Sequence, residues 1–381
     1  MFKFNFIEET DQTTTTNTNQ SKKLKNDSNS NELVYDQIGG IYSYEELIQK
    51  RPEKTIVYKS LNLSNLSKIE LIDSSKVILD ESDELSKINE THDVVPGKYE
   101  GGLKVWELSI DLAKFVYNSI HFEEEKLKKL NFELDILTEL ASIRNFFFHY
   151  VNTTQNLELR VLELGCGHAL PCLAILKMLE ENLKNENLSI VFYLQDFNEQ
   201  IVKDVTLENF KNYLEKSPLK NRVKINFVYG DWRYLHDKKV LPENYFNLIL
   251  TSETIYNSAN YEHLLNLFQL CLRSKHDDDN NDLQENSSVS SQLSSMVLLS
   301  SKTYYFGCGG NILEFVSEAK SSAYSFEASR NLLYDDLINC DKLNCQQVGE
   351  VKENKKEEEH STNSQINIIS KEIIKISKKK Y

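Results

Sequence analysis

The chain has 381 residues, with 58 acidic side chains against 44 basic ones and a formal net charge of −14. This length allows one large or two ordinary domains with a substantial core. The acidic balance disfavours a direct nucleic-acid partner and suits a basic protein better.

The six cysteines form no Cys-x-x-Cys pair, which favours a reduced protein without a metal site. The first residues lack a long apolar core followed by a cleavage site, and no run of eighteen apolar residues occurs. We therefore expect neither a signal peptide nor a membrane span, and a cytoplasmic or nuclear protein.

The N-terminal part divides into two segments by composition. Residues 1–31 are polar and of low complexity, which predicts disorder. Residues 32–104 are mixed and contain the short β-like runs Thr55–Tyr58 and Lys76–Leu79. We expect 32–104 to be an extension that packs on the main domain, residues 105–381.

The main domain alternates between strand-like and helix-like patterns. Apolar residues at helical spacing predict helices over 106–120, 123–150, 169–183, 199–215 and 260–273. Apolar runs between the later helices predict the strands Arg160–Leu164, Ser189–Gln195, Val223–Tyr229, Phe246–Thr251 and Met296–Tyr305. Such alternation predicts the α/β class, a Rossmann-like, mostly parallel sheet with helices on both faces.

Two polar blocks interrupt the later part of the chain. The acidic, Ser-rich segment 275–295 reads as a disordered insertion ahead of the fifth strand. The strand-like runs Gln346–Val351 and Ile366–Ile376 flank a polar loop at 352–365 and predict an antiparallel hairpin at the sheet edge. With this hairpin, the expected sheet has seven strands.

Four strand ends carry residues that suit a nucleoside ligand. The turn with Gly165 and Gly167 allows close approach of the backbone, Asp196 can accept from a ribose diol, and Asp231 can accept from an adenine amino group. Trp232 can pack on the ring, and Ser252 ends the fourth strand. An ordinary turn with a capping Asp or Ser explains each end alone, but an adenosine ligand explains all four.

The glycine turn argues against a dinucleotide. Ala169 replaces the third glycine of the dinucleotide fingerprint, so a nicotinamide dehydrogenase is disfavoured. S-adenosylmethionine has no phosphates to bind, and a turn without a phosphate-binding helix start fits it.

Several longer runs resemble one family. The segment 92–107, HDVVPGKYEGGLKVWE, is followed in order by VLELGCG, QDFN, GDW, LILTSETIYN and SKTYYFGCGG. These runs are similar to those of the histidine protein methyltransferase family, which belongs to the seven-β-strand class that uses S-adenosylmethionine. The most specific pieces are YEGGLKVWE and LTSETIYN.

The resemblance implies methyl transfer to a histidine side-chain nitrogen of a protein, typically a large-subunit ribosomal protein. With the glycine turn, it predicts cofactor contacts at Val105, Trp106, Glu107, Leu108, Ser109, Gly165, Gly167, Gln195, Asp196, Phe197, Gly230, Asp231, Trp232 and Ser252. We expect a monomer that binds a basic protein substrate and neither nucleic acid nor membrane.

Three residues just after the fourth strand are the catalytic candidates: Glu253, Tyr256 and Asn257. A neutral imidazole nitrogen is already a nucleophile, so the enzyme must mainly position it and fix its tautomer. Glu253 or Asn257 is the predicted orienting group, although capping of the loop is an alternative role. A protein-lysine methyltransferase of the same fold and a non-catalytic binder of ribosomal protein remain open.

Overall fold

A computed structural model describes residues 39–49, 56–73, 92–128, 132–274, 295–324, 326–330, 332, 337 and 371–379. The expectations for 1–31, 76–79, 346–351 and 352–365, and for all but the last residue of the 275–295 insertion, lie outside these residues. Within the described ranges, no helix is long and apolar enough to cross a membrane.

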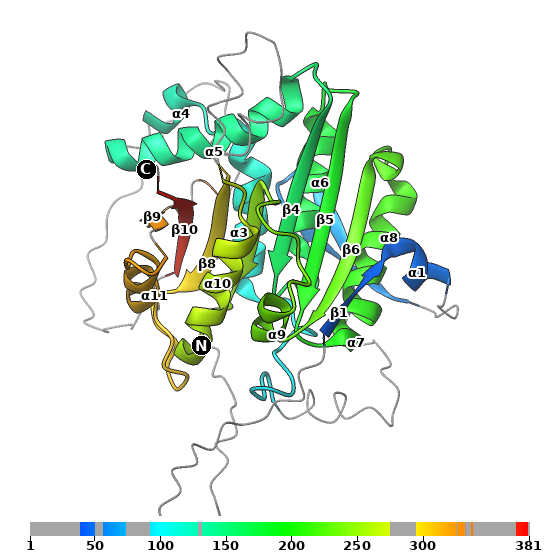
Figure 1. Cartoon of the computed structure of the whole chain (residues 1–381). Helices are drawn as coiled ribbons and strands as arrows, with labels where there is room; N and C mark the ends of the chain where they lie inside the picture. The colour runs from blue at the N-terminus through cyan, green and yellow to red at the C-terminus, as the bar shows by residue number, and fades with distance from the viewer. Residues whose placement is uncertain are drawn as a thin grey trace, which may run out of the picture.

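An eight-stranded sheet organises the molecule in the order β1-β6-β5-β4-β7-β8-β10-β9 (Figure 1). Its strands are β1 (Gly39–Ser43), β4 (Leu157–Leu164), β5 (Leu188–Asp196), β6 (Val223–Gly230), β7 (Leu248–Ser252), β8 (Met296–Lys302), β9 (Phe326–Ser329) and β10 (Lys371–Lys378). The five strands from β4 to β8 pair in parallel, whereas β1 pairs antiparallel with β6, and β10 pairs antiparallel with β8 and β9.

The central strands are buried on both faces, as a parallel sheet between two helical layers requires. Neighbouring residues of β4 enter different cores: Val161 packs with one cluster of buried side chains and Leu162 with the other. The first core contains α3 (Glu107–Asn118), α5 (Leu134–Asn152), α6 (Leu170–Asn182) and α8 (Leu207–Lys216). The second contains α9 (Trp232–Asp237), α10 (Tyr261–Cys271) and α11 (Ile312–Ala319).

The predicted α/β class and the five central strands are confirmed. Three predicted helices also form, but 123–150 is broken into α4 (Glu124–Lys128) and α5. The helix expected at 199–215 contains a π-helical turn, Val202–Thr206, between α7 (Glu199–Ile201) and α8. Short 3-10 turns lie at Ser119–His121, Lys220–Arg222 and Ser258–Asn260.

The two sheet edges differ from the sequence-based expectation. Two described strands were not predicted: β1, which is followed by α1 (Tyr44–Gln49), and β9. The described sheet therefore has eight strands, whereas seven were expected. At the opposite edge β10 is flanked by β8 and β9, so the described strand within 366–376 is an inner strand.

The described extension forms a hairpin and a long connection. β2 (Tyr58–Asn62) and β3 (Lys68–Ile72) pair antiparallel, and Asn209 of α8 accepts a hydrogen bond from the backbone of Ile72 at 2.7 Å. Residues 92–106, called the strap below, then run across the carboxyl ends of the parallel strands before α3 begins.

Candidate functional site

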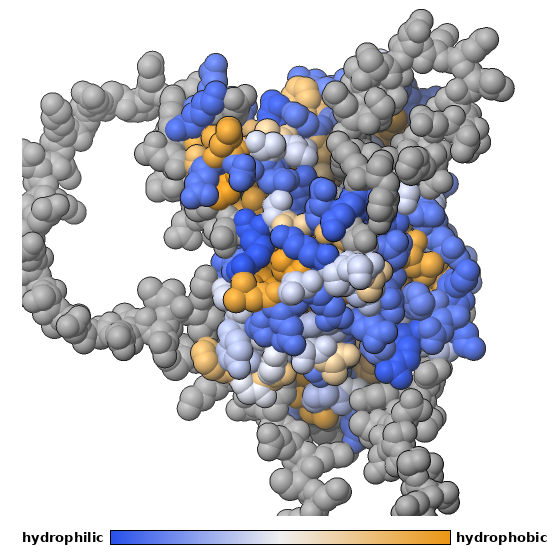
Figure 2. Space-filling view, turned by 60° about the vertical axis from the view of Figure 1, so that its left-hand side comes forward, coloured by the Kyte–Doolittle hydropathy of each residue, from blue (hydrophilic) through white to orange (hydrophobic). Residues whose placement is uncertain are grey.

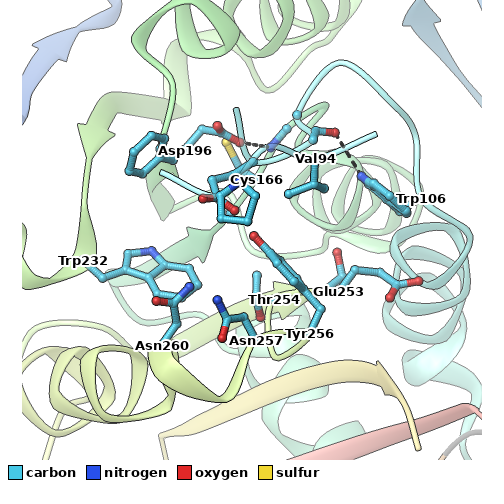
Figure 3. Close-up of a pocket in the computed structure, with 18 of the residues that line it drawn as sticks. Val94, Trp106, Cys166, Asp196, Trp232, Glu253, Thr254, Tyr256, Asn257 and Asn260 are labelled. Carbon is cyan, nitrogen blue, oxygen red and sulfur yellow. Dashed lines mark hydrogen bonds between the residues drawn. The ribbon is translucent and has the colours of Figure 1, made fainter. Parts of the chain in front are cut away.

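A cavity of about 610 Å³ lies at the carboxyl ends of β4, β5, β6 and β7 (Figure 3). The chain leaves β4 towards β5 on one side and reaches β7 on the other, so the strand order reverses at this point. In open α/β sheets such a reversal opens a crevice for a ligand. The strap and the loop after β7 complete the cavity wall.

The glycine turn after β4 lets two other segments approach the cavity floor. A Cβ on Gly165 would lie 2.7 Å from the Thr254 methyl group, and one on Gly167 would lie 3.2 Å from the Gly102 carbonyl oxygen. Both glycines have positive φ, as does Ala169 directly before α6. A larger residue at 165 would therefore push the turn away from the β7 loop.

Glu163, near the end of β4, links this strand to the start of α6. Its Oε2 accepts a hydrogen bond from the backbone of Cys172 in the first turn of α6, at 3.0 Å. Burial raises the pKa of Glu163 to about 8, so its neutral form is favoured in the folded protein at pH 7.

Gln195 connects three of the predicted strand ends. Its Oε1 accepts hydrogen bonds from Gly165 N–H at 3.2 Å and from Trp232 Nε1–H at 2.9 Å, and its Nε2 donates to the Gly230 carbonyl at 3.0 Å. Gln195 is fully buried and does not line the cavity. The structure therefore places it behind the site, as the group that fixes the turn, the β6 end and the indole relative to one another.

Asp196 lines the cavity, and both of its carboxylate oxygens accept hydrogen bonds from backbone N–H groups. Oδ2 accepts from Gly167 N–H at 3.0 Å and Oδ1 from Asn198 N–H at 3.1 Å. Burial raises the pKa of this carboxyl group to about 6. Phe197, the next residue, also lines the cavity.

The β6 end presents Gly230, Asp231 and Trp232 to the cavity. Asp231 Oδ1 accepts from the backbone of Arg233 at 2.8 Å and of Tyr234 at 3.3 Å, which caps α9. Asp231 therefore has the helix-capping role that was the alternative explanation in the sequence, and it also lines the cavity.

Only some of the predicted cofactor contacts around the start of α3 face the cavity. Val105, Trp106 and Ser109 line the cavity, whereas Glu107 and Leu108 do not. Glu107 forms an ion pair with Lys371 of β10, and the buried Leu108 accepts at its carbonyl from Ser300 Oγ at 3.0 Å. A helix turns its side chains about its axis, so five consecutive residues cannot all face one cavity.

The loop after β7 is held in a strained conformation. Glu253 has φ of 57°, which is unusual for a residue other than glycine. Its Oε2 accepts from Tyr305 Oη at 2.5 Å, and Lys302 Nζ lies 3.7 Å from its Oε1. Burial raises the pKa of Glu253. Such strain persists only where the surroundings enforce it.

Three candidate catalytic side chains point in different directions. Tyr256 directs its hydroxyl into the cavity, whereas Glu253 extends towards α3 (Figure 3). Asn257 Oδ1 accepts from Ala259 N–H at 3.0 Å and caps the following turn. All three residues, and Ser252, line the cavity.

Gly310 packs against the backbone of Tyr256 and fixes its position. Its N–H donates to the Tyr256 carbonyl at 2.9 Å, and a Cβ would lie 2.1 Å from the Ile255 carbonyl oxygen. No side chain fits there without displacing the Tyr256 backbone.

Several strap residues that line the cavity, among them Glu100, Gly102 and Lys104, had no predicted site role. Trp106 Nε1 donates to the Gly101 carbonyl at 3.0 Å, and Lys104 pairs with Asp93 at 3.0 Å. Together with Glu100 and Gly102, these bonds make the strap a wall of the cavity. The run YEGGLKVWE, noted for its resemblance, was the available signal for this wall.

The chain is similar in sequence to known protein methyltransferases. Residues 91–277 match a family model described as lysine methyltransferase. The chain is 31% identical to a histidine protein methyltransferase 1 homolog of Dictyostelium discoideum, over 60% of this chain and 52% of that protein. It is 27% identical to histidine protein methyltransferase 1 of Schizosaccharomyces pombe, over 63% of this chain and 62% of that protein. The resemblance seen in the sequence is thereby confirmed.

The extent of these matches is partial. The chain spans about half to three-fifths of the length of these curated relatives. Among solved structures, a CurJ carbon methyltransferase matches with a TM-score of 0.36 and 10% identity, over 68% of this chain and 58% of that chain.

Proposed function

We propose that this protein transfers a methyl group from S-adenosylmethionine to a histidine side chain of another protein. The observation that carries the proposal is the cavity at the strand reversal, which joins the predicted strand ends to the β7 loop. The similarity to histidine protein methyltransferases supports the same activity.

The described residues fit this cofactor. The cavity offers carboxylates at Asp196, Asp231 and Glu100 for hydroxyl and amino donors, and the half-buried Trp232 offers an aromatic surface. When bound, the cofactor would supply an electrophilic methyl group on a sulfonium. The glycine turn and the strap would hold it, with water excluded by the covering strap.

The protein's own contribution is to position a neutral imidazole. With the cofactor bound, one ring nitrogen would take the methyl group as the S–C bond breaks, and the proton on the other nitrogen would then be released to solvent. Because the attacking nitrogen needs its lone pair, the other nitrogen carries the hydrogen and needs an acceptor.

Among the three catalytic candidates, Tyr256 best meets this requirement. Its hydroxyl oxygen can accept from the imidazole N–H and lies in the cavity. The Asn257 oxygen is committed to the turn, and an amide nitrogen facing the ring would select the wrong tautomer. Glu253, bound to Tyr305, would act by holding the loop.

The decisive experiment incubates the protein with labelled S-adenosylmethionine and purified large-subunit ribosomal proteins. Mass spectrometry of the labelled peptide should place the methyl group on a histidine. Label on lysine alone, or no label with any of these proteins, would contradict the proposal.

A lysine acceptor is the second candidate, because residues 91–277 match a family model described as lysine methyltransferase. A lysine amine must lose a proton before it attacks, whereas a neutral imidazole need not. Matched peptides that differ only by histidine or lysine at the target position separate the two. A non-catalytic binder would show no calorimetric binding of S-adenosylmethionine.

A basic large-subunit ribosomal protein is the substrate we propose, because the net charge of −14 favours a cationic partner. We further propose a monomer in the cytoplasm or nucleus. Light scattering on the purified chain and imaging of a tagged copy test these two points.

A further inference from the structure

One carboxylate of the strap, Glu100, was not among the cofactor contacts predicted from the sequence. Glu100 lines the cavity, and its Oε1 accepts from Gly97 N–H at 2.7 Å. Its backbone N–H donates to Asn198 Oδ1 at 3.2 Å, and Asn198 Nδ2 donates to the Lys98 carbonyl at 2.7 Å. The position of Glu100 is therefore fixed by the residues on either side of it.

The second oxygen of this carboxyl group is unpaired. Glu100 Oε2 is closed to solvent and has no hydrogen-bond partner within the described structure. A buried acceptor without a donor is unfavourable, and native proteins rarely retain one without a functional reason. A ligand donor is one such reason.

The surroundings of Glu100 indicate which donor. Asp196 and Asp231 act on it electrostatically, and Gly102 of the strap lies against Asp196, since a Cβ there would be 3.1 Å from Asp196 Oδ2. Both Asp196 oxygens already accept from backbone amides, and one Asp231 oxygen caps α9. The ribose was predicted to bind at the end of β5, beside Asp196. The acceptor without a hydrogen-bond partner there is Glu100 Oε2 of the strap.

We propose that Glu100 Oε2 accepts a hydrogen bond from a ribose hydroxyl of the adenosine ligand, sharing the sugar with Asp196. The inference rests on the proposed use of S-adenosylmethionine. It assigns ribose recognition to both sides of the cavity, so that the ligand itself joins the strap to β5.

The protonation of Glu100 provides an independent signal. Burial, with smaller contributions from Asp196 and Asp231, raises the pKa of Glu100 to about 7. A hydroxyl that donates to the carboxylate favours its charged form and lowers this pKa. Ligand binding at pH 7 should therefore release protons from Glu100.

Calorimetry with S-adenosylhomocysteine and its 2′-deoxy and 3′-deoxy analogues tests the contact. In the unaltered protein, loss of the relevant hydroxyl should weaken binding about 10-fold or more. Glu100→Gln should weaken S-adenosylhomocysteine similarly and show a much smaller further loss with that analogue. Glu215→Gln, an exposed carboxylate of α8 outside the cavity wall, is the matched control.

Titrations at pH 7 in buffers of different ionisation enthalpy measure the proton release. Release should be smaller in Glu100→Gln than in the unaltered protein, and equal release in both overturns the inference. Should Glu100→Gln fail to fold, the unaltered protein still decides, because equal affinity for all three ligands also overturns it. Failure of the unaltered protein to bind S-adenosylhomocysteine at all would instead refute the proposed function.

Discussion

Replacing Gln195 by leucine should separate a positioning role from direct cofactor contact. Leucine fills a similar volume but makes none of the three hydrogen bonds to Gly165, Trp232 and Gly230. The Gly230 residue is buried, whereas Gly165 and Trp232 are partly exposed and can regain water. At ~1–3 kcal/mol for each buried polar group left unpaired, we expect a stability loss of about 2–4 kcal/mol.

Calorimetric unfolding measures that loss. For a domain of this size, about 2–4 °C of melting temperature is lost for each kcal/mol, so Gln195→Leu should melt roughly 5–15 °C lower. Gln155→Leu, at an exposed position, should change little.

The same variant should bind the cofactor at least about 10-fold more weakly, because the turn and the indole lose their common anchor. The titration is performed well below the melting temperature of the variant. An unchanged dissociation constant in a destabilised variant would refute the positioning argument, since the three strand ends would then keep their geometry without Gln195.

Three further outcomes follow from the site. Tyr256→Phe should reduce kcat about 10-fold or more with little change in cofactor affinity, and full turnover by this variant would contradict the role of the hydroxyl. Gly310→Ala should lower kcat and cost roughly 1–3 kcal/mol of stability, because its Cβ would overlap the Ile255 carbonyl. Normal stability and turnover would contradict this, since the backbone at Ile255 would then move aside at no cost. For Glu163, whose folded pKa is raised to about 8, the folded state holds a proton that the unfolded chain loses above pH ~4.3. Its contribution to stability therefore falls between about pH 4.5 and 8, by up to ~1.4 kcal/mol per pH unit, and is already lost above that window. Denaturant unfolding should show this fall relative to Glu163→Gln, and parallel pH profiles would contradict it.

The central sheet was predictable because its information is local. The strands from β4 to β8 are short segments rich in apolar residues, and the glycine turn at Gly165 follows the first of them. β1, with the sequence GGIYS, has no such pattern. Gly39–Ser43 forms a strand in the structure through its pairing with β6. Its two glycines leave room for the rings of Tyr234 and Tyr229, a requirement that no local pattern reveals.

Side-chain direction was the main limit on predicting the site. Gln195, Asp196 and Phe197 were all expected to contact the cofactor, because the run QDFN resembles the family's run at this strand end. Successive strand residues point to opposite faces, however, and Gln195 turns inward to hold its neighbours. The sequence indicated the correct strand end but could not distinguish a residue that lines the cavity from one that supports it.

The strap shows why the cavity depends on more than its strand ends. His168 follows the glycine turn, and its Nε2 lies 3.0 Å from the Leu103 carbonyl while Asn209 Nδ2 lies 3.3 Å from its Nδ1. Burial lowers the pKa of His168 to about 4, so the ring is neutral at pH 7. Because Asn209 Nδ2 can only donate, the ring hydrogen must be on Nε2, where it binds the strap. The wall therefore crosses the boundary expected at residue 104, and the segment read as an extension provides one side of the site.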